Sequence, residues 1–395
     1  MPLERAYRKV GPSAPSHPAI IPCSVQRENR AFLSSRIEAE MRSSPRTEPD
    51  SQPALSAIDS VLRDAGLTRS PREKPSALRS FPQFDGALHD ELRVAAPVPS
   101  RAANGVQWLP VPGWNLPWLW SGFSTRRGGL SRAYCADDAP GELNLGFTAA
   151  DDRTLVERNR RLLAEAVTGE ARTPIVPVRQ FHSNLVVRAT SEDSGRSQTH
   201  KGDGLMTNQP GFLLAIQTAD CIPVLVADRK RRAVAAFHAG WRGTVKRIVE
   251  NGVGLMRLAF GSRPSDLIAA IGPGIGACCY AVGDEVFSEF DSQFPYAREL
   301  FREVYDADPV RKKYPMLFLN QRAPGHGSIG PQLHVDLIEA NRRQLLAAGL
   351  SPRAIEVVGG CTQCHSGLFF SHRGSQGHAG RMMAVIGIRG TRATT

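Results

Sequence analysis

Apolar residues fall into two kinds of pattern along this chain, and both become sustained only after about residue 105. Short apolar runs bounded by glycine and acidic residues predict strands within 211–228 and at 233–241, 266–276, 354–360 and 381–388. Apolar residues recur at helical spacing over 242–261 and 334–350, with a glycine at or near the end of each segment. Strands and helices do not alternate strictly, so we predict an α/β (α+β) fold with mixed sheets.

The first hundred residues have a different composition, with 13 prolines, 14 serines and no sustained apolar period. One short amphipathic piece at 54–67 has the spacing of a helix. A segment of this kind buries too little apolar surface to fold alone. We therefore predict a disordered Pro/Ser-rich segment at 1–104, followed by one folded domain at 105–390.

The charge and the cysteine content narrow the functional classes. The formal net charge is +11, but it is spread along the chain, and the dense basic run Arg229–Arg232 lies between two apolar strands, where a hairpin turn is expected. We therefore expect no nucleic-acid partner. The sequence contains no run of about 18 apolar residues, so we predict no membrane span. An odd count of seven cysteines and an N-terminus without an apolar signal region predict a reducing, cytoplasmic location.

Three residues form a candidate metal site. His182, Cys221 and His238 all lie at the ends of predicted elements, where a rigid scaffold presents side chains to a cleft. Two imidazoles and one thiolate are a typical catalytic zinc set, with a fourth position open for water. Spacing alone does not separate this interpretation from that of ordinary core residues.

The motifs around these residues resemble a known family. In chain order they are GFSTRRGGLS (122–131), ELNLGF (142–147), QFHSN (180–184), DGLMT (203–207), TADCIPVLVAD (218–228), AAFHAGWRGT (235–244), IGPGIGACCYAVGDEV (271–286) and FFSHRG followed by GRM (369–382). This set is similar to the laccase-domain family, once called multicopper polyphenol oxidases and now regarded as zinc-dependent purine nucleoside phosphorylases with adenosine deaminase activity. The resemblance covers about 270 residues, from Gly122 to the C-terminus.

The resemblance implies a layered α/β/β/α domain, with His182, Cys221 and His238 as the metal ligands. Its implied substrates are inorganic phosphate and purine nucleosides, namely adenosine, inosine and relatives such as methylthioadenosine. Arginine suits phosphate recognition, so the arginines on two glycine turns are candidate phosphate ligands. The predicted substrate-binding residues are Arg126, Asn144, Asp220, Cys279 and Arg373.

Asp220 is expected to orient a metal ligand or water, and Asn144 to fix the loop that carries Arg126. The segment CTQCH at 361–365 matches the pattern that attaches c-type haem. The resemblance and the missing export signal argue against covalent haem and make Cys364 and His365 ordinary loop residues. Cys278 and Cys279 are adjacent, and we expect them to be too close to serve readily as two tetrahedral ligands.

Three alternatives stay open from the sequence. The first is a copper polyphenol oxidase, although the chain contains no His-x-His pair for a copper cluster. The second is a cysteine hydrolase or amidase, with Cys221 as nucleophile and His238 as its base. The third is a non-enzymatic adaptor that binds its partner through residues 1–104.

Overall fold

The structure is a computed structural model that describes residues 83–84, 96–135, 139–194, 200–304 and 332–390. They all belong to one compact unit, Arg79–Thr395. The predicted helix at 54–67 and most of the predicted disordered segment lie outside the described residues. The folded part begins before the predicted boundary at 105, because strand β2 (Ser100–Arg101) pairs with β3 (Gln107–Leu109).

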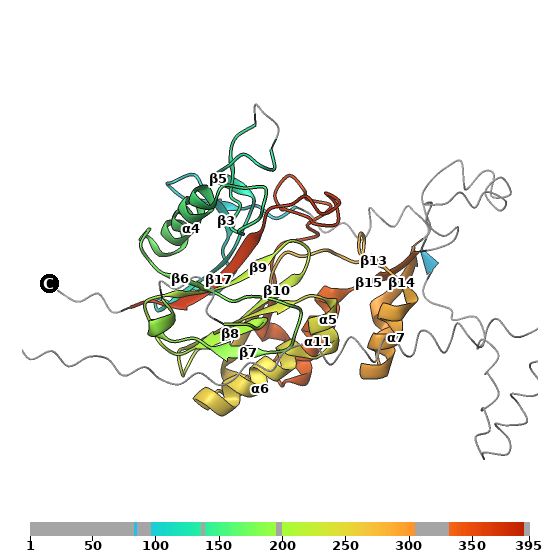
Figure 1. Ribbon diagram of the computed structural model, residues 1–395. Helices are drawn as coiled ribbons and strands as arrows, with labels where there is room; N and C mark the ends of the chain where they lie inside the picture. Colours follow the sequence, from blue (N-terminus) through green and yellow to red (C-terminus); the bar gives the residue numbers. More distant parts are fainter. Residues whose placement is uncertain (1–82, 85–95, 136–138, 195–199, 305–331, 391–395) are drawn as a thin grey trace, which may run out of the picture. The chain divides into compact units, whose positions relative to one another are not determined.

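Two six-stranded sheets form the centre of this unit (Figure 1). The first has the order β2, β3, β4 (Leu119–Ser124), β17 (Met382–Ile388), β9 (Leu213–Thr218) and β6 (Ile175–Pro177). The second has the order β16 (Ile355–Val357), β12 (Leu267–Ile271), β10 (Ile222–Asp228), β11 (Ala233–Ala239), β8 (Gly204–Thr207) and β7 (Val186–Arg188). A smaller sheet joins β1 (Gln83–Phe84), β14 (Phe301–Val304), β15 (Gln332–Val335) and β13 (Ala281–Val282), and β5 (Arg127–Ser131) follows β4.

Helices cover the outer faces of the two large sheets. Helix α4 (Arg153–Thr168) packs its buried Leu163 against the first sheet. Helices α6 (Ile248–Phe260) and α11 (Leu337–Ala347) pack against the second sheet in a separate apolar cluster. The other helical pieces of the described residues are α5 (Trp241–Val245), α7 (Asp284–Gln293), α8 (Ala297–Leu300) and three 3-10 turns, Ser191–Asp193, Pro264–Asp266 and Pro352–Ala354.

A third apolar cluster fills the space between the two large sheets. It includes Ile216 and Ala384 from the first sheet and Leu225 and Ala236 from the second. Because each sheet thus buries both faces, its strands contain continuous apolar runs instead of an alternating pattern. The layered α/β/β/α fold expected from the resemblance is confirmed.

Most predicted elements are present, with two shifts. The predicted helix at 242–261 is split into α5 and α6, because Arg247 adopts a left-handed conformation with φ 58°. The predicted helix at 334–350 starts only at Leu337, since the preceding residues form β15 and pair with β14.

The basic run is a hairpin turn, as predicted, in which the Asp228 carboxylate accepts from the N–H groups of Lys230 and Arg231. Among the described residues, no helix combines the length and apolar character that a membrane span requires.

One close contact between α6 and the second sheet gives a test of this packing. A Cβ added at Gly252 would lie 2.3 Å from the ring of the fully buried Phe237, whereas one added at Gly254 on the same helix would meet nothing within 4 Å. We predict that Gly252→Ala lowers the free energy of unfolding by about 1–3 kcal/mol through overpacking. The matched control, Gly254→Ala, should raise it by up to about 1 kcal/mol through helix propensity. Urea unfolding of both variants is the measurement, and equal effects would contradict this packing.

Candidate metal centre and pocket

The structure brings His182, Cys221 and His238 to one point. His182 lies in the loop after β6, Cys221 in the turn between β9 and β10, and His238 near the end of β11. His182 Nε2 lies 3.8 Å from Cys221 Sγ, and the two imidazole centroids are 5.0 Å apart. The nearest ligand atoms of all three residues lie within 4.8 Å of one another. Donor atoms this close to one another suit a single metal ion.

A buried carboxylate holds the two histidines in place. Asp203, directly before β8, is fully buried and accepts a hydrogen bond from His238 Nδ1 at 2.8 Å. The same carboxylate accepts from the backbone N–H of His182 at 2.9 Å and from the N–H and hydroxyl of Ser183. Because Nδ1 of His238 is engaged, its Nε2 is left for a metal. Asp203 was not singled out in the sequence, although it opens the DGLMT motif.

The same contacts shift the pKa values of the site. Burial alone would raise the pKa of Cys221, but the charge of His238 and a hydrogen bond from His182 outweigh it and lower the pKa to about 6. Burial opposes the charging of His238, yet the Cys221 thiolate and Asp203 raise its pKa to about 9. Burial also opposes the ionisation of Asp203, while hydrogen bonds from His238 and Ser183 hold its pKa well below the usual range. Without metal, the directions of these shifts favour a thiolate beside an imidazolium.

The backbone around the centre is strained. His182 has φ 63° and Asp220, the neighbour of Cys221, has φ 92°, a left-handed conformation that residues other than glycine rarely adopt. Gly240 leaves the space that the ligands occupy, since a Cβ there would lie 2.9 Å from both Cys221 Sγ and His182 Cδ2. Strain of this kind is retained mainly at functional sites.

A cavity of about 420 Å³ opens onto the three ligands, a size typical of small-molecule sites. It contains two arginines that the sequence analysis missed, Arg179 and Arg381. Arg179 directly precedes the quoted motif QFHSN and Arg381 lies within the quoted motif GRM, so their neighbourhood was recognisable but their roles were not. The other lining residues are Val178, Gln180, Gln217, Thr218, Ala219 and His372.

The predicted arginine ligands lie elsewhere. Arg126 forms an ion pair with Glu142 at 2.7 Å and donates to the carbonyl of Ser366. Arg373 donates to the carbonyl of Ala281 and lines a separate cavity beside Tyr280. The structure brings neither arginine to the lining of the metal-centre cavity.

The other predicted substrate residues take part in loop contacts. The Asn144 side-chain oxygen accepts from the backbone N–H of Arg381 at 2.8 Å, so it positions a pocket arginine. Asp220 accepts from the Thr362 hydroxyl and from the backbone N–H of Arg373, both at 2.6 Å. These bonds join the turn that carries Cys221 to the turn at 361–365 and to the FFSHRG loop. Substrate contact by Asn144 and Asp220 stays a prediction.

The cysteines that were expected to be unrelated lie together. Cys279 is one of four cysteines whose sulfur atoms all lie within 4.8 Å of one another. The others are Cys278, Cys361 and Cys364, so Cys364 is not an isolated loop residue and the adjacent pair does reach one point. The tight turn at 276–280, in which the N–H groups of Cys279 and Tyr280 both donate to the Gly276 carbonyl, makes this possible.

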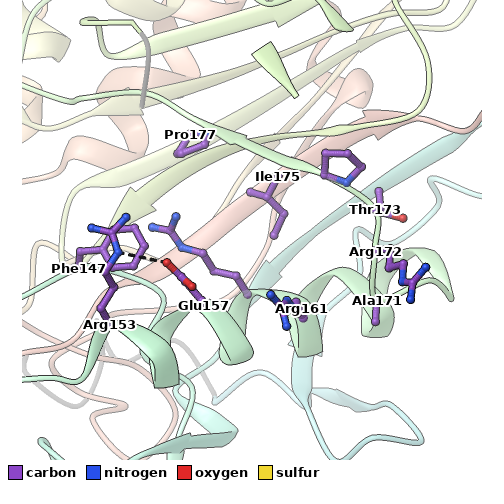
Figure 2. Close-up of a pocket in the computed structure, with 11 residues that line it drawn as sticks. Phe147, Arg153, Glu157, Arg161, Ala171, Arg172, Thr173, Ile175 and Pro177 are labelled. Atoms are coloured by element: carbon purple, nitrogen blue, oxygen red, sulfur yellow. Dashed lines mark hydrogen bonds and ion pairs between the residues drawn. The ribbon is translucent and has the colours of Figure 1, made fainter. Parts of the chain in front are cut away.

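A larger, arginine-rich cleft lies between α4 and β6 (Figure 2). In it Arg153 pairs with Glu157 at 3.1 Å, and the guanidinium of Arg160 lies over the ring of Phe147. Burial lowers the pKa of Arg160 to about 10. Neither histidine nor cysteine is among the described residues that line this cleft. We therefore assign the chemistry to the smaller cavity at the metal centre.

Comparison with known proteins agrees with this geometry. The model of the family described as multi-copper polyphenol oxidoreductase laccase matches residues 120–389. The chain belongs to this family. It is 37% identical over 275 residues to a protein named purine nucleoside phosphorylase YlmD from Geobacillus stearothermophilus, with 68% of this chain and 90% of that relative covered. A Bacteroides thetaiotaomicron protein named purine nucleoside phosphorylase is 33% identical over 268 residues, covering 67% of this chain and 89% of the relative.

The solved structures give the same family. The crystal structure of YlmD from Geobacillus stearothermophilus is similar at a TM-score of 0.59 and 34% sequence identity, covering 74% of this chain and all of that chain. The resemblance drawn from the motifs is therefore confirmed, and it extends over the residues that build the metal centre.

Asp203 offers a direct test of how the centre is held. We predict that Asp203→Asn weakens zinc binding at the centre about 10–100-fold, because an amide cannot fix His238 as the carboxylate does. A suitable control is Asp193→Asn, which alters another carboxylate–histidine pair, with His200 at 2.9 Å. Competition with a chromophoric chelator measures the affinity. Equal affinity in the Asp203→Asn variant and the wild type would remove Asp203 from this role.

The lowered pKa of Cys221 predicts its reactivity. In chelator-treated protein, alkylation of Cys221 by iodoacetamide should reach half of its plateau rate near pH 6, because the thiolate is the reactive form and its pKa is about 6. Below that pH the thiol is protonated and the rate should fall. In a His238→Gln variant the midpoint should move toward about 8.5, the value of an ordinary thiol. Peptide mass spectrometry resolves the site, and a wild-type midpoint above pH 8 would contradict the thiolate–imidazolium pair.

Proposed function

We propose that the chain is a zinc-dependent purine nucleoside phosphorylase that acts on adenosine, inosine and related nucleosides, including methylthioadenosine, with adenosine deaminase activity. The observation that carries the proposal is one cavity that joins a His₂Cys metal set to two arginines. The names of the relatives point to the phosphorolysis of purine nucleosides.

The donor set fits zinc, since two neutral imidazoles and a thiolate are preferred zinc ligands, and a carboxylate fixes one imidazole. His182 and His238, each through Nε2, and Cys221 through Sγ would hold the ion. Bound there, zinc would supply a Lewis acid that acidifies water or polarises a substrate oxygen. Phosphorolysis and deamination involve no electron transfer, so the reaction does not call for the copper of the family's description.

In phosphorolysis an oxygen of inorganic phosphate forms a bond to C1′ of the ribose, and the bond from C1′ to the purine breaks. The electron pair leaves with the purine, which takes up a proton, so the products are ribose 1-phosphate and the free base. We assign the phosphate to Arg179 and Arg381, because both line the cavity and a guanidinium is a planar cationic donor; Nη1 of Arg381 also donates to the carbonyls of Ala379 and Gly380. Asn144 supports this assignment indirectly, through its bond to the Arg381 backbone.

The position of Arg126 gives it a different role in this proposal. Its two Nη atoms are engaged by Glu142 and by carbonyl oxygens, and its guanidinium lies over the ring of Phe370 at 4.6 Å. We propose that it supports the wall of the site. Phosphate binding by Arg126 or Arg373, expected from the sequence, is the competing assignment.

A second candidate function is favoured by one observation. The contacts match those of a cysteine hydrolase: the Cys221 thiolate lies beside the His238 imidazolium, and the Asp203 carboxylate orients that imidazolium. However, His182 also lies against the thiolate, and a nucleophile–base pair does not require a second imidazole. A metal explains all three donors, whereas a hydrolase explains two.

The activity test compares the arginines. With inosine and phosphate the protein should release hypoxanthine and ribose 1-phosphate, and with adenosine it should also give inosine. We predict that Arg381→Ala lowers phosphorolysis by roughly two to three decades and deamination much less, because only phosphorolysis must hold the phosphate anion. Arg126→Ala is the matched comparison and should lower both rates together, if at all. Chromatography of the bases and nucleosides measures both reactions.

Two outcomes would contradict the proposal in different ways. A selective loss of phosphorolysis in Arg126→Ala, with Arg381→Ala unaffected, would return the phosphate to Arg126. Zinc-free protein that keeps full activity on an amide substrate, and has none on nucleosides, would favour the cysteine hydrolase.

A further inference from the structure

Four cysteines form a second cluster of soft ligands, which shares no residue with the candidate metal centre. Cys278 and Cys279 lie in the turn after β12, and Cys361 and Cys364 lie in the turn after β16. The Sγ atom of Cys364 is 3.4 Å from the Sγ atoms of both Cys278 and Cys279. Cys278 and Cys361 are buried, and the other two are partly buried.

The backbone of both turns is built to bring these sulfurs together. Gly274 and Cys361 form an isolated parallel bridge, and the N–H of Thr362 donates to the Gly274 carbonyl at 3.0 Å. The N–H of His365 donates to the Cys361 carbonyl, which closes the Cys-x-x-Cys turn. A Cβ at Gly276 would lie 3.2 Å from Cys278 Sγ and from Cys361 Cβ, so glycine leaves the space where the two turns meet.

The spacing of the sulfurs suits one tetrahedral ion. With zinc–sulfur bonds of about 2.3 Å, the sulfurs of a tetrahedral site lie about 3.8 Å apart. The cluster has contacts of 3.4 Å and no separation beyond 4.8 Å, so its spacing brackets that value. A multinuclear iron–sulfur cluster needs wider spacing, because inorganic sulfide lies between its irons. A disulfide would use two sulfurs and leave the convergence of the other two unexplained.

We propose that Cys278, Cys279, Cys361 and Cys364 bind a second zinc ion in a closed, structural site. All four positions are filled by protein sulfur, so this site has no position for substrate. Two thiols come from each turn, and the ion therefore fastens the two turns to each other.

The contacts of these turns show what the second ion would stabilise. Thr362, next to Cys361, donates to the Asp220 carboxylate at 2.6 Å, and the N–H of Ile275 donates to the Asp220 carbonyl at 2.8 Å. Asp220 is the left-handed residue directly before Cys221. Both turns thus hold the strained backbone that presents a ligand of the first metal centre. We expect loss of the second ion to loosen that centre without removing any of its ligands.

The test is the zinc content and ligation of the full chain, purified under reducing conditions. Wild-type protein should contain about two zinc ions per chain, and Cys364→Ser should lose about one. Cys135→Ser, which changes a cysteine outside both clusters, should keep both. Zinc X-ray absorption of Cys221→Ser should show the remaining ion with about four sulfur neighbours at about 2.3 Å. This last measurement keeps the proposal testable if Cys364→Ser folds poorly.

Three results would overturn the proposal. The first is an unchanged zinc content in Cys364→Ser. The second is a remaining ion in Cys221→Ser that has nitrogen or oxygen among its neighbours. The third is a disulfide between two of the four cysteines in freshly reduced wild-type protein that contains about one zinc ion. None of these results depends on nucleoside activity. Failure here therefore leaves the proposed function standing, and failure of the nucleoside assay leaves this site standing.

Discussion

The arrangement of the site depends on one buried carboxylate. Asp203 has no solvent exposure, and its two oxygens accept from His238 Nδ1 and from the backbone N–H groups of His182 and Ser183. A buried anion without these donors would cost several kcal/mol. The loop of His182 must therefore stay folded around Asp203, and His238 must keep Nε2 directed toward Cys221. The positions of the candidate metal ligands therefore follow from satisfying this carboxylate.

The two large sheets supply the rigid frame for that carboxylate. Asp203 leads into β8 and His238 lies on β11, and these strands are paired, with the His238 N–H donating to the Asp203 carbonyl at 2.7 Å. Cys221 enters from the turn between β9 and β10, one strand from each sheet. The centre thus lies where the chain passes from one sheet to the other. The glycine at position 240 is required because three donors and a strand end meet in one small space.

Much of the fold could be predicted from the sequence, and so could the three residues that meet at the candidate metal centre. The apolar runs of β9, β10, β11, β12 and β17 are unbroken because both faces of each sheet are buried, and their ends located Cys221 and His238. The split between α5 and α6 could not be predicted, because it depends on a left-handed Arg247 within an otherwise helical pattern. The predicted helix at 334–350 also began too early, because the residues before α11 pair with β14, and this pairing overrides their local preference for a helix.

The polar residues of the site were harder to predict, for a physical reason. Arg126 and Arg373 lie on glycine turns that suggest phosphate binding, but their guanidinium groups donate to nearby carboxylate or carbonyl oxygens outside the cavity at the candidate metal centre. Arg179 and Arg381 reach the cavity only because β6, β9 and β17 are neighbours in one sheet, which is a long-range property. The convergence of Cys278 and Cys279 with Cys361 and Cys364 likewise depends on two turns that are far apart in the sequence.

In the site that we propose, Asp203 holds His182, Cys221 and His238 as the ligands of one zinc ion. Crystals of the zinc-loaded protein, measured at wavelengths on both sides of the zinc absorption edge, test it most directly. We predict an anomalous difference peak about 2.0–2.1 Å from the Nε2 atoms of His182 and His238 and about 2.3 Å from Cys221 Sγ. Zinc-loaded crystals without a peak at these three atoms, or with Cys221 outside the coordination shell, would contradict it.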